Sequence, residues 1–123
     1  MPAKKKILIV DDEPDVVAFL KKRLQARDYN VISANDGIEG LKKAIDEKPD
    51  LILLDIIMPN KDGFAMLKEL KDKETTKEMP VIIISVKGES SAIFEGQELG
   101  ATDYLIKPYD FQELLKYIKK YSL

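Results

Sequence analysis

The stretch Leu51–Pro59, with the sequence LILLDIIMP, decides the fold. Four apolar residues, LILL, precede one carboxylate, Asp55, and turn-forming residues stand on both sides of the stretch. An apolar run of about four to eight residues is typical of a strand buried on both faces, or of part of a buried helix. The flanking turn residues, including Pro49 and Pro59-Asn60, favour the strand. Asp55 is therefore expected where a central strand ends, although an aspartate taken alone there is most often a loop or capping residue.

The composition is that of one ordinary globular domain. With 123 residues and a net charge of −2, the chain gives no sign of a nucleic-acid or membrane surface. No apolar run approaches the roughly 20 residues that cross a bilayer. We expect a single domain over residues 1–123. The sequence has no cysteine and no signal-peptide pattern, so we expect a reducing, cytoplasmic location.

The absence of histidine and cysteine narrows the possible chemistry. Without them the chain has no Ser-His-Asp or Cys-His nucleophile system and no ordinary zinc site. Any metal would be bound by carboxylate and carbonyl oxygens, which favours Mg²⁺, Mn²⁺ or Ca²⁺.

Strand and helix patterns alternate along the whole chain. The expected strands are Lys6–Val10, Asn30–Ala34, Leu51–Leu54, Val81–Ser85 and Asp103–Ile106. An amphipathic or helix-forming segment follows each strand, the fourth of these, Glu89–Leu99, being weak because it contains Ser90, Ser91 and Gly96. This alternation predicts an α/β fold, (βα)5, with a doubly wound five-stranded parallel sheet.

Two local expectations concern the segments between strands. Ile38, Leu41 and Ile45 recur at helical spacing, so we expect them to form the inner face of the second helix. Lys71–Glu78 is rich in charge and is predicted to be a solvated connection.

Polar residues stand at the ends of four expected strands: Asp11-Asp12, Asp55, Ser85 and Lys107. Because the carboxyl ends of parallel strands share one edge, these side chains should converge there. Each also has an ordinary reading. The aspartate pair could cap a helix, Ser85 could be a strand-end hydroxyl, and Lys107 could be a solvated lysine.

Gathered carboxylates need a counter-charge. Two unit charges about 4 Å apart repel by about 4 kcal/mol at an effective dielectric of about 20. A divalent cation offsets this repulsion, and oxygen ligands suit Mg²⁺. With Lys107 as the counter-charge for an anion, the pattern indicates phosphoryl transfer to a carboxylate, with Asp55 as the nucleophile.

The chain resembles response-regulator receiver domains, the phosphoacceptor modules of two-component signalling. The resemblance covers nearly the whole sequence and is carried by KILIVDDEPDV, PDLILLDIIMPNKDG, PVIIIS and GATDYLIKP. It implies the flavodoxin-like fold, whose strand order is 2-1-3-4-5. It also implies that the chain is no enzyme beyond catalysing its own phosphorylation and dephosphorylation.

The resemblance implies a role for each residue of the metal site. Asp55 would be phosphorylated by a histidine kinase or a histidine phosphotransfer protein. Asp12 and Asp55 would bind Mg²⁺ directly, with Mn²⁺ as a possible substitute. Asp11 would act through water, and Ile57 would contribute its backbone carbonyl.

The resemblance also implies a switch. Ser85 would take a phosphoryl oxygen, and Lys107 would pair with the phosphate, with a cis peptide before Pro108. Tyr104 matches the aromatic switch position, although a strand aromatic packed on the last helix is the alternative. Phosphorylation would then shift the face formed by the fourth helix, the fifth strand and the fifth helix. Phe94 is a further candidate for partner contact there, with a place in the core as the alternative.

Three residues depart from the usual pattern or vary within it. Val86 stands where the family usually has a smaller residue, and we expect it to narrow the path to Asp55. Ile57 and Lys87 would flank the phosphoryl group, and an apolar Ile57 cannot hydrogen-bond an attacking water. We therefore expect the phosphorylated form to hydrolyse slowly.

Other functions on the same fold fit less well. A phosphorylation-independent interaction module is the main alternative. A haloacid-dehalogenase-like phosphatase needs a polar helper where Ile57 stands, and a flavodoxin needs a Ser/Thr/Gly-rich loop where the sequence reads Asp-Asp-Glu-Pro. The output would be a downstream protein or a missing effector domain, as a monomer or a phosphorylation-dependent dimer, with no nucleic acid bound by this chain.

Overall fold

The computed structural model describes residues 4–58 and 62–121, and within them five strands alternate with five helices. The strands are β1 (Lys6–Val10), β2 (Asn30–Ala34), β3 (Leu51–Leu54), β4 (Val81–Ser85) and β5 (Asp103–Ile106). The helices are α1 (Pro14–Gln25), α2 (Gly37–Glu47), α3 (Gly63–Asp72), α4 (Ser90–Glu98) and α5 (Phe111–Lys120). The strands have the predicted bounds. The predicted turn at Pro59-Asn60 lies outside the described residues.

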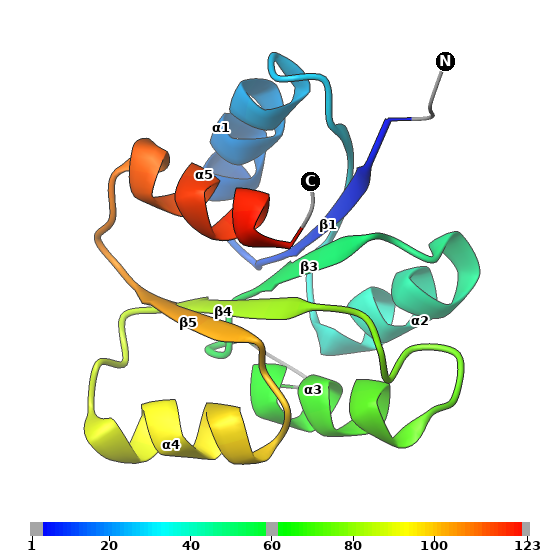
Figure 1. Ribbon diagram of the computed structural model, residues 1–123, viewed down its shortest axis with the longest axis vertical. Helices are drawn as coiled ribbons and strands as arrows, with labels where there is room; N and C mark the ends of the chain where they lie inside the picture. The colour runs from blue at the N-terminus through cyan, green and yellow to red at the C-terminus, as the bar shows by residue number, and fades with distance from the viewer. Residues whose placement is uncertain (1–3, 59–61, 122–123) are drawn as a thin grey trace.

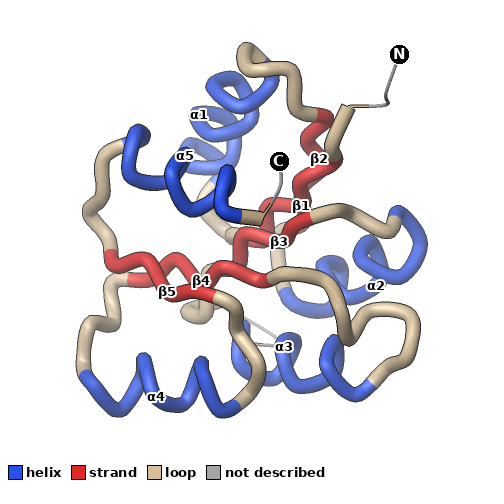
Figure 2. The backbone as a smooth tube through the Cα atoms, in the orientation of Figure 1, coloured by secondary structure: helices blue, strands red, loops and turns tan. Residues whose placement is uncertain are grey.

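All neighbouring strands are parallel, in the order β2-β1-β3-β4-β5. Figure 1 shows α1 and α5 on one face of this sheet and α2, α3 and α4 on the other. In Figure 2 the strands form a single middle layer between the two layers of helices. The two faces of the sheet contribute to two separate apolar clusters, as a doubly covered parallel sheet requires. The α/β prediction and its strand order are confirmed.

The register of the central strands places the acidic residues side by side. Val10 pairs with Leu54 where β1 and β3 end. The Asp55 amide, one residue further on, donates to the Val10 carbonyl at 2.9 Å. Since both strands end at the same level, Asp11 and Asp55 leave the sheet as neighbours.

The predicted inner face of α2 was wrong at one position. The Ile38 side chain is 59% exposed, while Gly40 and Ala44 are buried. A Cβ at Gly40 would lie only 3.0 Å from side-chain atoms of Met66 and Val10. Because α2 packs this closely on its neighbours, small residues form its inner face, and apolar spacing alone does not reveal this.

The prediction that Lys71–Glu78 is solvated was also wrong in part. Lys71 lies in the last turn of α3, and its ammonium donates to the carbonyls of Lys77 and Met79. Thr76 is fully buried, and its hydroxyl donates to the Leu70 carbonyl at 2.5 Å. Carbonyls that end a helix need donors, and Thr76 supplies one to Leu70, while Lys71 of the helix supplies donors to two carbonyls of the connection.

The ends of the later elements follow the sequence. Gly100 has φ 99°, the left-handed conformation that suits the residue after α4, and Asp110 caps α5 by accepting from the Glu113 amide. The peptide between Lys107 and Pro108 is cis, as expected. Among the described residues no helix is both long and apolar enough to cross a bilayer.

Candidate functional site

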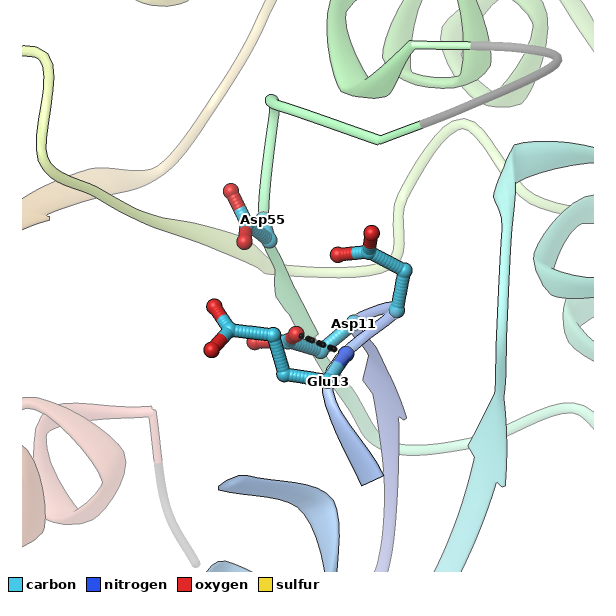
Figure 3. A group of neighbouring side chains, drawn as sticks. Asp11, Glu13 and Asp55 are labelled. Atoms are coloured by element: carbon cyan, nitrogen blue, oxygen red, sulfur yellow. Dashed lines mark hydrogen bonds between the residues drawn. The ribbon is translucent and has the colours of Figure 1, made fainter. Parts of the chain in front are cut away.

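Four carboxylates gather where β1 and β3 end. Asp11, Asp12, Glu13 and Asp55 each place one oxygen within 4.8 Å of the others. Asp11 and Asp55 are buried, whereas Asp12 and Glu13 are exposed. Figure 3 shows Asp11, Glu13 and Asp55 meeting from the two strand ends. The predicted convergence of the aspartates is thus present in the structure.

Backbone amides orient the two buried carboxylates. Oδ1 of Asp11 accepts from the Glu13 amide at 2.9 Å, the bond dashed in Figure 3. Oδ1 of Asp55 accepts in the same way from the Ile57 amide at 3.0 Å. Each amide lies two residues after its aspartate, the arrangement of an Asx turn. The second oxygen of each carboxylate is left for other partners.

Lys107 lies between those second oxygens. Its Nζ is 3.5 Å from Oδ2 of Asp11 and 3.4 Å from Oδ2 of Asp55. Burial alone would lower the pKa of Lys107, but the charges of Asp11 and Asp55 outweigh it and the net shift is upward. Burial raises the pKa of Asp11, although its bond to the Glu13 amide and the charge of Lys107 oppose the shift.

Ser85 and Tyr104 are connected through the backbone of Lys87. The fully buried Ser85 accepts through Oγ from the Lys87 amide at 3.1 Å. The Tyr104 hydroxyl donates to the Lys87 carbonyl at 2.6 Å. Burial raises the pKa of Tyr104, and the Ser85 hydroxyl opposes the shift. The loop after β4 therefore contacts both residues of the predicted switch.

The residues predicted to flank Asp55 lie in two different hollows. Ile57, 46% exposed, and Lys87 line one together with Phe64. Val86 is 63% exposed and lines a second, between α1 and the start of α5. The narrowing effect assigned to Val86 stays a prediction. Phe94 on α4 is 51% exposed and thus available for contact.

Glu13 is the residue of this cluster that the sequence reasoning missed. An acidic residue before Pro14 suits a helix N-terminus, so the position of Glu13 alone does not indicate the cluster. The signal was present in the run Asp11-Asp12-Glu13, which places three carboxylates directly after β1. The side chain of Glu13 does not cap the helix.

The donor set fits a hard divalent cation. All four candidate ligands are carboxylates, and Lys107 pairs with two of them, Asp11 and Asp55, among the described residues. A single ammonium leaves most of their charge uncompensated. Oxygen ligands around such an excess of negative charge are what Mg²⁺ and Mn²⁺ bind.

The comparisons with known proteins agree with this fold. The profile of the response regulator receiver domain matches residues 7–119. The chain therefore belongs to the response regulator receiver domain family, the receivers of two-component signalling. The family prediction is confirmed.

Similar proteins include regulators and isolated receivers. The chain is 43% identical over 115 residues to the alkaline phosphatase synthesis transcriptional regulatory protein PhoP of Bacillus subtilis, covering 94% of this chain and 47% of PhoP. It is 32% identical to chemotaxis protein CheY4 of Vibrio cholerae, with a TM-score of 0.91 over 96% of this chain and 98% of CheY4.

The BeF3-activated N-terminal receiver domain of Klebsiella pneumoniae RstA is also similar. It is 28% identical, with a TM-score of 0.88 over 95% of this chain and 97% of that one. The chain spans about half the length of the curated relatives it matches.

Proposed function

We propose that Asp55 accepts a phosphoryl group from a phosphohistidine of a histidine kinase or a histidine phosphotransfer protein. The observation that carries this proposal is the position of the Asp55 carboxylate. It is buried at the end of β3, within 4.8 Å of three other carboxylates and 3.4 Å from the Lys107 ammonium. A carboxylate in such a site can act as a nucleophile, because Lys107 and a bound cation would offset the charge on the phosphoryl oxygens.

Asp12 and Asp55 are proposed to hold Mg²⁺ directly, together with the Ile57 carbonyl, and Asp11 to hold it through water. Mn²⁺ would be accepted by the same oxygens. When bound, the ion neutralises charge on the transferring phosphoryl oxygens. The exposed Asp12 supports this assignment, because it has no hydrogen bond or ion pair among the described residues.

In the transfer, an Asp55 oxygen forms a bond to phosphorus as the phosphorus–nitrogen bond to the donor histidine breaks. The electron pair stays on the imidazole, which takes up a proton. Lys107 remains protonated, in keeping with its raised pKa, and pairs with a phosphoryl oxygen. Asp11 and Asp55 hold its ammonium in place beforehand.

Ser85 is proposed to carry the change outward. Its hydroxyl would turn to a phosphoryl oxygen and give up the Lys87 amide, which it now accepts from at 3.1 Å. Tyr104 is bonded to the carbonyl of the same Lys87, so its environment changes with the loop. This shifts an existing equilibrium between two states of the α4-β5-α5 face.

The downstream partner is proposed to be a protein or an effector domain that contacts this face, where Phe94 is exposed. No DNA-binding activity is proposed for this chain. Loss of the phosphoryl group is proposed to be catalysed by the chain itself. A phosphorylation-dependent dimer remains compatible with the exposed face. The cytoplasmic location stays a prediction.

Beryllofluoride with Mg²⁺ tests this function against the interaction module that ignores phosphorylation. Amide NMR spectra are recorded before and after addition, with Asp55→Asn as the matched control. We expect shifts at Asp55, Ser85, Lys87 and Tyr104 in the wild type alone. Equal spectra with and without beryllofluoride would support the module.

A further inference from the structure

Glu13 is a fourth carboxylate at the acidic cluster, and neither the sequence pattern nor the proposed mechanism uses it. Its backbone amide holds Asp11. Its carboxylate lies within 4.8 Å of oxygens of Asp11, Asp12 and Asp55. Figure 3 shows this side chain beside the two buried aspartates.

The simplest structural role for Glu13 is helix capping, and the geometry does not support it. Glu13 is the N-cap residue of α1, with extended backbone at φ −96° and ψ 108°, but its side chain makes no capping hydrogen bond. Glutamate is also not among the side chains that cap helices well, which are those of Ser, Thr, Asp and Asn. The Glu13 carboxylate is thus available for another partner.

The four carboxylates divide into two pairs. Asp11 and Asp55 each accept from a backbone amide and also face Lys107. Asp12 and Glu13 have neither a hydrogen bond nor an ion pair of their side chains among the described residues. Asp12 has an assigned task as a direct metal ligand, which leaves Glu13 as the free acceptor on this side of the cluster.

We propose that Glu13 binds the metal through water, as an outer ligand that raises the affinity of the site for divalent cations. Mg²⁺ keeps several of its waters when bound to protein, and their hydrogens need acceptors close to the ion. An exposed carboxylate within 4.8 Å of the other ligand oxygens is placed to accept from them. The proposal rests on the proposed function, because it requires a metal at this cluster.

The test is metal affinity rather than activity. Mg²⁺ binding is measured by calorimetry and Mn²⁺ binding by electron paramagnetic resonance. Glu13→Gln keeps the shape of the side chain and should weaken both by about tenfold, the usual cost of losing an outer ligand partner. Glu13→Asp, which keeps the carboxylate, should retain part of the affinity.

Asp15→Asn is the matched control. Asp15 lies in the same first turn of α1 and is exposed, but it is outside the cluster. Its loss should cost less than about twofold and have no effect in about 1 M salt, where the Debye length is about 3 Å. The Glu13→Gln effect should persist there. Equal effects of the two substitutions at both salt concentrations would overturn the proposal.

Melting curves supply the second readout. Without metal, Glu13→Gln should melt no lower than the wild type, because it removes like-charge repulsion. Its upward shift with Mg²⁺ should be smaller. A wild-type chain that binds neither ion would refute the proposed function itself, whereas wild-type binding that Glu13→Gln leaves unchanged would refute this inference alone.

Discussion

The ammonium of Lys107 lies 3.4 Å from Oδ2 of Asp55, across the sheet edge from the end of β5 to the end of β3. The same ammonium lies 3.5 Å from Oδ2 of Asp11. One cation therefore joins the ends of three strands, β1, β3 and β5. Its side chain is only 18% exposed, so water screens the attraction between the ammonium and the two carboxylates only weakly.

Lys107→Met should lower the free energy of unfolding by about 1–3 kcal/mol, because two buried carboxylates lose their counter-charge. Urea denaturation without metal measures this, and added Mg²⁺ should restore part of the loss. Lys116→Met on the exposed side of α5 is the control and should change stability by less than about 0.5 kcal/mol. Equal effects of the two substitutions would contradict the role given to Lys107.

Gly63 allows α3 to begin in close contact with the backbone of Asp55 and Ile56. A Cβ there would lie 2.5 Å from the Cα of Ile56 and 2.6 Å from the Asp55 carbonyl oxygen. Both are backbone atoms, so Gly63→Ala must displace the chain that carries Asp55. We expect a loss of about 1–3 kcal/mol in unfolding free energy and slower phosphorylation.

Gly88→Ala is the control for that substitution. Its added Cβ would first meet the Cδ1 of Ile106 at 3.4 Å, an ordinary contact. Calorimetric melting of the two variants gives the comparison. If Gly63→Ala melts as high as Gly88→Ala, the close packing of α3 on the Asp55 peptide has no energetic weight.

Ile57 should set the lifetime of the phosphorylated state. Its side chain is 46% exposed in the hollow that it shares with Lys87, and it offers no hydrogen bond to an attacking water. Ile57→Asn should speed the loss of phosphate about tenfold, less than the roughly 100-fold or more that a full general acid or base contributes. Decay is followed by Phos-tag electrophoresis, with Ile38→Asn as the control at an exposed isoleucine of α2.

Tyr121 connects the end of α5 to the start of β5. Its hydroxyl donates to Oδ2 of Asp103 at 2.7 Å. Burial, followed by this bond and the charge of Asp103, raises the pKa of Tyr121 to about 12. The folded pKa lies above the unfolded value of about 10, so the stabilisation is complete below pH 10 and is lost as pH rises towards 12.

Ultraviolet titration of the phenols should therefore show a tyrosine that titrates near pH 12, besides Tyr29, Tyr104 and Tyr109, whose pKa values are also raised. Tyr121→Phe should remove the titration near pH 12, and Asp103→Asn should bring it closer to the usual pKa. A titration near pH 12 that persists in Tyr121→Phe would show that the assignment is wrong.

Much of the fold could be predicted because buried parallel strands need continuous apolar runs, as in Leu51–Leu54. The convergence of Asp11, Asp55 and Lys107 followed from topology, since parallel strands end together. Close packing was not predictable in this way. Gly40 rather than Ile38 lies on the inner face of α2, because the close approach of α2 to its neighbours decides which residue fits.

Side-chain partners also could not be predicted. The burial of Thr76 depends on the carbonyl it reaches at Leu70, and the bond from Tyr104 to Lys87 depends on how the loop after β4 folds back. The carboxylate of Glu13 could not be placed at the cluster from the sequence, because an acidic residue before Pro14 also suits a helix N-terminus. In each case the deciding contact lies outside the local pattern.

The most direct test of the account is to locate the phosphoryl group. The chain is incubated with acetyl phosphate and Mg²⁺, trapped by borohydride reduction of the acyl phosphate, digested and sequenced by mass spectrometry. We predict that one residue, Asp55, is reduced, and that neither Asp55→Asn nor the metal-free wild type is labelled. Labelling of Asp11 or Asp12 in place of Asp55, or no labelling with metal present, would contradict the account.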